Sequence, residues 1–232
     1  MRESIIIVKD FYDNPDEVRE YAFNCIYYDA YENIDDDINH RIHWEYSRSQ
    51  DRYVTDENIS KLENIIGAKI DIEHFKTSDH WVHPRGCKWN AGFQIKSSDD
   101  GTLTTTKDLD CIHEHINDNW NQVPQDTGWT GVLFLTPDNI ASKDCGTAIW
   151  YNNSIGTVNH KDEWICDTIE NYEFEDTTVF GKYGQWDLFA QFQFKYNTLV
   201  LMKPELFHAG LGRFGNNHRN SRIIQTFFFK EK

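Results

Sequence analysis

The sequence predicts a mainly β fold, either a sandwich or a barrel, with helices only in its N-terminal region. Several short apolar runs separated by turn residues follow residue 67. Two segments before residue 67 carry apolar side chains at helical spacing. The chain has 232 residues, a length that suits one large all-β domain. We therefore predict a single domain over residues 1–232, in which a helical layer over 1–67 flanks a β core over 68–232.

The N-terminal region begins with a short apolar β run at residues 5–8. A first helix should follow, because Asn14 can cap it and Pro15 suits its first position. A second helix should begin after the capping residue Thr55 and end at Gly67, since glycine readily takes the left-handed conformation that closes helices. Both helices should pack one apolar face on the β core.

The β core should begin after Gly67, where helical spacing gives way to short strand-like runs. The segment 158–196 is acidic and aromatic but has no clear period, and it is long for a plain loop. We expect an insertion there, either with a helix of its own or as a lid. The predicted strands cover residues 89–95, 110–116, 128–135, 146–151, 197–202 and 222–229.

The composition narrows the class of partner. A formal net charge of -15 argues against nucleic acid or an anionic membrane surface. The five cysteines are odd in number and have no paired-ligand spacing, which is typical of reduced thiols in the cytoplasm. The first apolar run is too short for a signal peptide. We expect a soluble cytoplasmic protein that acts on a small molecule or a protein side chain, and the oligomeric state stays open.

Three histidines form the strongest candidate for a metal site. His113 and His115 alternate along one predicted strand, so their rings should share a face. A buried strand rarely carries two ionisable rings on one face without a use for them. His208, which follows another strand, can supply the third ligand and leave metal positions open for a co-substrate and oxygen. Asp118 is the main rival of His115, and a bulge could instead bring in Glu114.

Arg222 is the candidate for binding an acidic co-substrate. It follows a glycine-rich loop and opens a second apolar strand, so we expect it to point into one pocket with His208 from a neighbouring strand. A guanidinium matches a carboxylate as a planar fork, which suggests a co-substrate with a carboxylate. The alternative for this residue is a surface ion pair at the end of a strand.

Other side chains can line such a pocket. Trp129, Trp150 and Phe228 are candidates, although aromatic residues on strands are more often part of a core. Asn90 and Gln94 could donate hydrogen bonds to a co-substrate or substrate.

The sequence resembles the iron(II)- and 2-oxoglutarate-dependent oxygenase superfamily, most closely its small, prolyl-hydroxylase-like branch in bacteria and phages. The resemblance covers nearly the whole chain, although none of its segments is decisive alone. The similar segments are residues 10–19, 90–94, 112–113, 129–137 and 146–147, and the pair 207–208 followed by 222–229.

The resemblance implies a double-stranded β-helix, or jelly roll, with flanking helices. It also implies that His113 and His208 bind iron and that Arg222 binds the distal carboxylate of 2-oxoglutarate. The family pattern is His-x-Asp or His-x-Glu, whereas the matching position here is His115. The site therefore uses three histidines, recruits Asp118, or lacks oxygenase activity.

The function that we expect is that of an Fe(II)- and 2-oxoglutarate-dependent dioxygenase, an oxidoreductase that hydroxylates an unidentified substrate. One alternative is a jelly-roll binding protein without catalysis. Another is a cupin-like dioxygenase with a three-histidine iron and no 2-oxoglutarate, in which Arg222 would bind the carboxylate of the substrate. The identity of the third ligand and the direction of Arg222 separate these functions.

Overall fold

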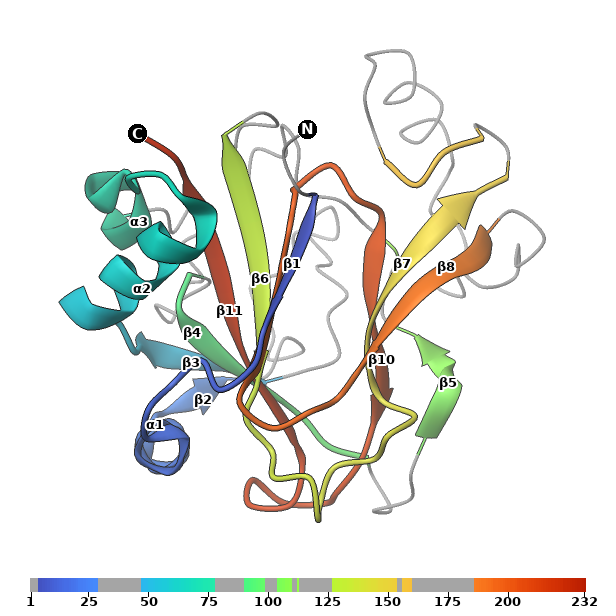
Figure 1. The fold of residues 1–232 in the computed structure, drawn as a ribbon. Helices are drawn as coiled ribbons and strands as arrows, with labels where there is room; N and C mark the ends of the chain where they lie inside the picture. The colour runs from blue at the N-terminus through green and yellow to red at the C-terminus, as the bar shows by residue number, and fades with distance from the viewer. Residues whose placement is uncertain are drawn as a thin grey trace, which may run out of the picture.

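The fold consists of two antiparallel sheets and three helices (Figure 1). The computed structural model describes residues 4–28, 47–77, 90–98, 104–109, 112, 127–153, 156–159 and 186–232. The larger sheet contains, in spatial order, β1 (Ile5–Val8), β9 (Thr198–Met202), β6 (Gly128–Phe134), β11 (Arg222–Lys230), β4 (Gly92–Lys96), β3 (Ser47–Arg52) and β2 (Tyr27–Tyr28). The smaller sheet contains β5 (Thr104–Leu109), β10 (His208–Arg213), β7 (Gly146–Asn152) and β8 (Trp186–Gln193). The prediction of a mainly β protein is confirmed.

The chain crosses repeatedly between the two sheets. Strands β4, β6, β9 and β11 belong to the larger sheet, and β5, β7, β8 and β10 belong to the smaller one. Every strand pair is antiparallel, including the central pairs of β11 with β4 and with β6. Such crossing between two packed antiparallel sheets is consistent with a jelly roll.

The two predicted helices form where their end signals lie. Helix α1 (Pro15–Asn24) begins at the proline that we expected in its first position. Helix α2 (Asp56–Ile66) is capped by Thr55, whose hydroxyl accepts a hydrogen bond from Asn58 N. Gly67 ends it in the left-handed conformation, with φ 69°.

A third helix, α3 (Ile72–Thr77), was not predicted, and the expectation of strands alone after Gly67 is wrong. Six residues are too few to show a helical period in the sequence. Its start depends on Asp71, whose side chain accepts from His74 N at 3.0 Å. Among the described residues, none of the helices is long and apolar enough to cross a membrane.

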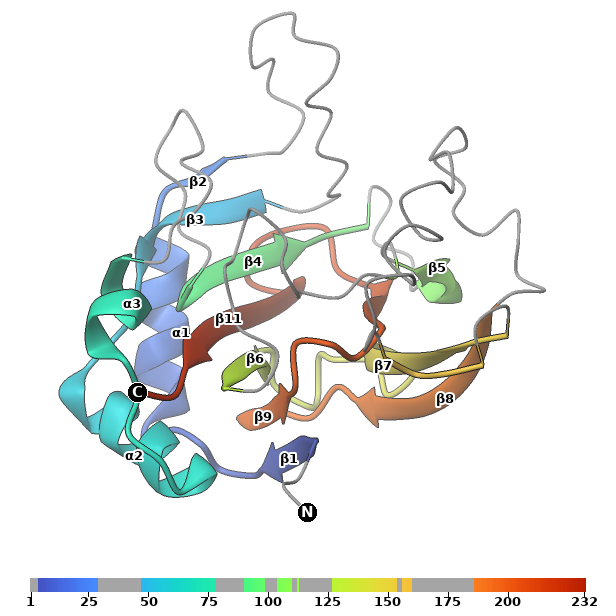
Figure 2. The ribbon, with the colours of Figure 1, turned by 90° about the horizontal axis from the view of Figure 1, so that it is seen from above.

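The helices cover one face of the larger sheet, and the smaller sheet covers the other (Figures 1 and 2). The cluster on the helix side contains aromatic side chains from α3 and the sheet, among them Phe75, Phe93, Phe227 and Phe229. Because side chains alternate along a strand, the residues between these on β4 and β11 face the smaller sheet. This alternation decides which residues can form an interior site.

Three strand predictions need correction. Residues 186–193 lie inside the predicted insertion over 158–196, yet they form β8 of the smaller sheet. The glycine-rich loop expected after His208 is strand β10. The N-terminal segment, residues 1–67, is not only a helical layer, because it also supplies β1, β2 and β3. Of the predicted strand 110–116, only Ile112 is among the described residues.

Candidate functional site

The space between the two sheets has an apolar half and a polar half. On the side of β6 and β9, Phe134, Val200 and Met202 pack against Ile149 of β7. On the side of β3, β4 and β11, the inward-facing side chains are polar or charged. In Figure 2 the strand β8 lies on the side of β9, and β5 lies on the side of β4. The polar half is defined here by the buried residues Arg48, Gln94, Lys96 and Arg222 of the larger sheet and His208 of the smaller sheet.

Arg222 crosses from the larger sheet to the smaller one. It precedes Ile223, which packs on the helix side, so Arg222 faces the smaller sheet. Its Nη2 donates to the carbonyl of Gly146 on β7 at 3.1 Å, and the residue is 3% exposed. Its buried Nε has no hydrogen-bond partner among the described residues. A buried guanidinium with an unused donor is suited to pairing with an anion.

Lys96 lies beside Arg222. The two residues are directly opposite each other in the pairing of β4 with β11, and Lys96 is 2% exposed. Both charges act on Cys145, the residue before Gly146. Burial raises the pKa of the Cys145 thiol, whereas the charges of Arg222 and Lys96 act to lower it. The two cations therefore lie near the same point at the start of β7.

Arg48 adds a third basic side chain, on β3. It pairs in register with Gln94 and shares its face. With the amide of Gln94 turned so that its oxygen faces the guanidinium, that oxygen accepts from Nη1 and Nη2 of Arg48 at 2.8 and 3.0 Å. Arg48, Lys96 and Arg222 thus place positive charge on three neighbouring strands of the polar half.

His208 faces the polar half from the smaller sheet. Its neighbours Phe207 and Ala209 pack on the outer side of that sheet, so the imidazole points between the sheets. The ring is 5% exposed, and its Nδ1 lies 2.8 Å from Leu206 O. A carbonyl only accepts, so Nδ1 carries the proton of the neutral ring and the lone pair is on Nε2. Metal-binding histidines are commonly oriented in this way.

His208 and Arg222 approach the same space from opposite sheets, and not from neighbouring strands as we expected. In the pairing of β10 with β7, His208 lies opposite Ile149, whereas Gly146 lies opposite Leu211. Three residues of a strand correspond to ~10 Å along β10. The imidazole and the guanidinium therefore mark two ends of one space, with room between them for a small dicarboxylate.

The other predicted metal ligands cannot be placed. His113, Glu114, His115 and Asp118 lie outside the described residues. Ile112 is described and buried, and it packs in one cluster with Phe207 on the outer side of the smaller sheet. Within the ranges that the structure describes, no group of three His, Cys, Asp or Glu side chains could hold a metal ion.

Asn90 has a structural role. Its Nδ2 donates to Phe75 O at 2.6 Å, and its Oδ1 accepts from Phe228 N at 2.8 Å. The side chain thus ties α3 to β11 and does not face the polar half. Of the two polar candidates for lining a pocket, only Gln94 does.

The aromatic candidates also separate. Trp129 packs on the helix side, under the ammonium of Lys203 at 3.9 Å, and Trp150 packs on the outer side of the smaller sheet. Phe228 lies between two residues that face the helices, so it faces the smaller sheet. Phe228 is the aromatic candidate that keeps a place near the polar half.

Two basic residues of the polar half were missed from the sequence. Lys96 follows Gln94 at strand spacing, so a polar face of β4 could have been recognised. Arg48 lies in a segment without a clear period, and its pairing with β4 is a long-range contact that the local sequence does not signal.

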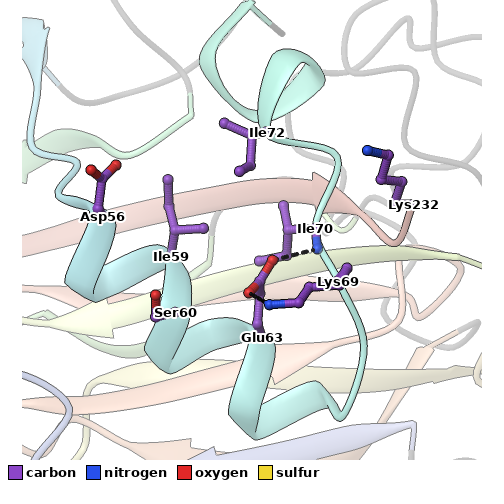
Figure 3. Close-up of a pocket in the computed structure, with 8 residues that line it drawn as sticks. All are labelled: Asp56, Ile59, Ser60, Glu63, Lys69, Ile70, Ile72 and Lys232. Atoms are coloured by element: carbon purple, nitrogen blue, oxygen red, sulfur yellow. Dashed lines mark hydrogen bonds and ion pairs between the residues drawn. The ribbon is translucent and has the colours of Figure 1, made fainter.

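A second hollow, of about 430 Å³, lies on the helical side of the molecule (Figure 3). It is lined by α2, by the turn after it and by Lys232. Its main carboxylate, Glu63, is already held by Lys69 Nζ at 2.6 Å and by Ile70 N at 3.1 Å. With its charge paired and no histidine or cysteine in its lining, this hollow offers less chemistry than the polar half.

No protein-family model and no curated protein matches the sequence. Two solved structures are similar in fold. HygX from Streptomyces hygroscopicus, solved with nickel and 2-oxoglutarate bound, is 10% identical, with a TM-score of 0.50 over 100% of this chain and 84% of that chain. The non-haem α-ketoglutarate-dependent epimerase SnoN from nogalamycin biosynthesis is 9% identical, with a TM-score of 0.46 over 99% and 79%. At these identities, the likeness to HygX concerns the fold alone.

Proposed function

We propose that the protein is an Fe(II)- and 2-oxoglutarate-dependent dioxygenase that hydroxylates an unidentified substrate. The observation that carries the proposal is the arrangement of His208 and Arg222. The first is a buried imidazole oriented by a backbone carbonyl, and the second is a buried guanidinium with an unused donor. They face one space from opposite sheets, as a metal ligand and a carboxylate partner should.

The path of the chain supports a double-stranded β-helix as the core. The strands β4 to β11 fill two four-stranded layers in the orders β9-β6-β11-β4 and β5-β10-β7-β8. The remaining strands β1, β2 and β3 extend the larger sheet at its edges. HygX, a protein of similar fold, was solved with nickel and 2-oxoglutarate bound, which makes this co-substrate the first to test.

His208 would hold the metal through Nε2. We propose His113 as the second ligand, because Ile112 packs in one cluster with Phe207, so both histidines follow residues of that cluster. His115 remains the proposed third ligand, with Asp118 as its alternative. Imidazole and carboxylate ligands with open positions suit non-haem iron. Bound iron would supply the activation of dioxygen that couples decarboxylation of the 2-oxo acid to oxidation of a C–H bond.

The residues of the chain would do the rest. Arg222 would bind the distal carboxylate as a fork, and its bond to Gly146 O fixes where that carboxylate lies. The apolar half, with Phe134 and Ile149, would exclude water from one side of the site. A third ligand of neutral histidine instead of a carboxylate would raise the charge of the metal site by one and favour an anionic co-substrate.

The test is an anaerobic titration of the purified protein with Fe(II) and then 2-oxoglutarate, followed by visible absorption. We expect the charge-transfer band of the chelate. The variant His208→Ala should lose iron binding. Arg222→Ala should keep iron but bind 2-oxoglutarate more weakly, by roughly 10- to 100-fold if one charged hydrogen-bonded pair is lost.

Arg219→Ala is the matched control, because Arg219 lies in the same turn but forms an exposed ion pair with Glu20. It should behave like the wild type. Iron binding without the band would favour a three-histidine dioxygenase that does not use 2-oxoglutarate. Unchanged iron content in His208→Ala would refute both functions.

A further inference from the structure

The end of the site marked by Arg222 carries two buried cations. Lys96 and Arg222 are directly opposite each other on β4 and β11, and both face the smaller sheet. Directly opposite residues of an antiparallel pair have Cβ atoms ~5 Å apart, and like charges in such positions repel each other. Burial of both side chains strengthens that repulsion, since little water screens it. An anion held by both would offset it.

Both cations reach the same region of the smaller sheet. Arg222 donates to Gly146 O, and the preceding residue, Cys145, is fully buried between the sheets. The charges of Arg222 and Lys96 both act on the thiol of Cys145. The start of β7 is therefore the point where the two positive charges converge.

We propose that Lys96 and Arg222 together form a two-cation anion site, which receives the far end of the 2-oxo acid and favours a group with two negative charges. The assignment to a 2-oxo acid rests on the proposed function, whereas the anion site rests on the two cations. One carboxylate neutralises only one of the charges. A phosphonate or phosphate dianion would neutralise both and can accept hydrogen bonds from the ammonium and the guanidinium at once.

The test is a calorimetric titration of the nickel-loaded protein with three 2-oxo acids. These are 2-oxoglutarate, its analogue with a phosphonate in place of the far carboxylate, and 2-oxobutanoate, which lacks any far anion. The wild type should bind the phosphonate analogue most tightly. Lys96→Met should weaken 2-oxoglutarate by roughly 10- to 100-fold, as expected for loss of one charged hydrogen bond, and the phosphonate by more. Binding of 2-oxobutanoate should not change.

Two further variants separate binding from stability. Lys96→Arg keeps the charge and should retain the preference for the dianion. Lys203→Met removes another buried lysine, one that lies over Trp129 and 3.8 Å from a carboxylate oxygen of Glu231. It should lower the melting temperature without changing any of the three affinities. If Lys96→Met does not fold, the comparison of phosphonate with carboxylate on the wild type decides.

The results that overturn the proposal are specific. Wild-type protein that binds 2-oxoglutarate more tightly than the phosphonate would overturn the preference for a dianion. Lys96→Met that loses all three acids equally, or none, would remove Lys96 from the site while leaving the proposed function intact. Inorganic phosphate should bind to the metal-free protein and be lost in Lys96→Met and Arg222→Met. Such binding without any binding of 2-oxo acids would keep the two-cation site and overturn its assignment to the co-substrate.

Discussion

Replacing Asn90 by alanine should destabilise the fold strongly without affecting the co-substrate. Asn90 is 0% exposed, and its amide satisfies two backbone groups, Phe75 O and Phe228 N, at 2.6 and 2.8 Å. Asn90→Ala leaves both groups buried without this partner. Each unsatisfied group costs about 1–3 kcal/mol, so the free energy of unfolding should fall by about 2–6 kcal/mol. That is a large fraction of the stability of a typical domain, about 5–15 kcal/mol.

The assay is urea unfolding followed by tryptophan fluorescence, together with titration of 2-oxoglutarate under native conditions. Asn24→Ala is the matched control, because the Asn24 side chain also donates to a backbone carbonyl, Glu20 O at 2.8 Å, but in an exposed position. It should change stability by no more than ~0.5 kcal/mol. A loss below ~1 kcal/mol in Asn90→Ala, where two groups at 1–3 kcal/mol each are expected, would refute the structural role. Weakened co-substrate binding at unchanged stability would do the same.

Three further predictions concern single contacts. Gly146→Ala should lower the melting temperature and weaken 2-oxoglutarate binding, because at φ 150° the new Cβ would lie 2.0 Å from a backbone oxygen of β8 and displace the acceptor of Arg222. Thr55→Ala should cost about 0.5–2 kcal/mol in urea unfolding, through loss of the helix cap. Hydrogen bonds, first from Lys69, lower the pKa of Glu63, so its carboxylate should stabilise the protein above the ordinary pKa and lose that effect as the pH falls through the folded pKa. Glu63→Gln should therefore melt earlier than the wild type at pH 7 but not in strong acid.

The elements of the fold that the sequence predicts are those with local signals. Helix α2 carries a cap at Thr55 and a stop at Gly67, and both act where they lie in the chain. Strands β6 and β11 are continuous apolar runs because both of their faces are covered. Such features do not depend on distant segments of the chain.

The elements that could not be predicted depend on tertiary contacts. Strand β8 is the edge of the smaller sheet and exposes Leu188 and Phe189, so its sequence lacks a regular buried face. Strand β10 contains two glycines, which indicate a loop when read locally. That His208 and Arg222 face each other from opposite sheets follows from the crossing of the chain, which no local pattern encodes. The metal roles of His113 and His115 stay predictions.

The bond from Arg222 to Gly146 O has a consequence for the thermodynamics of ligand capture. Arginine has several rotatable bonds, and holding such a side chain still normally costs an association about 0.5–1.5 kcal/mol. Here folding has already restricted the guanidinium, and it has done so relative to the sheet that carries His208. An arriving anion therefore loses little entropy in ordering its receptor. The benefit should appear mainly as slower dissociation, since mutations within one binding site act chiefly on the off-rate.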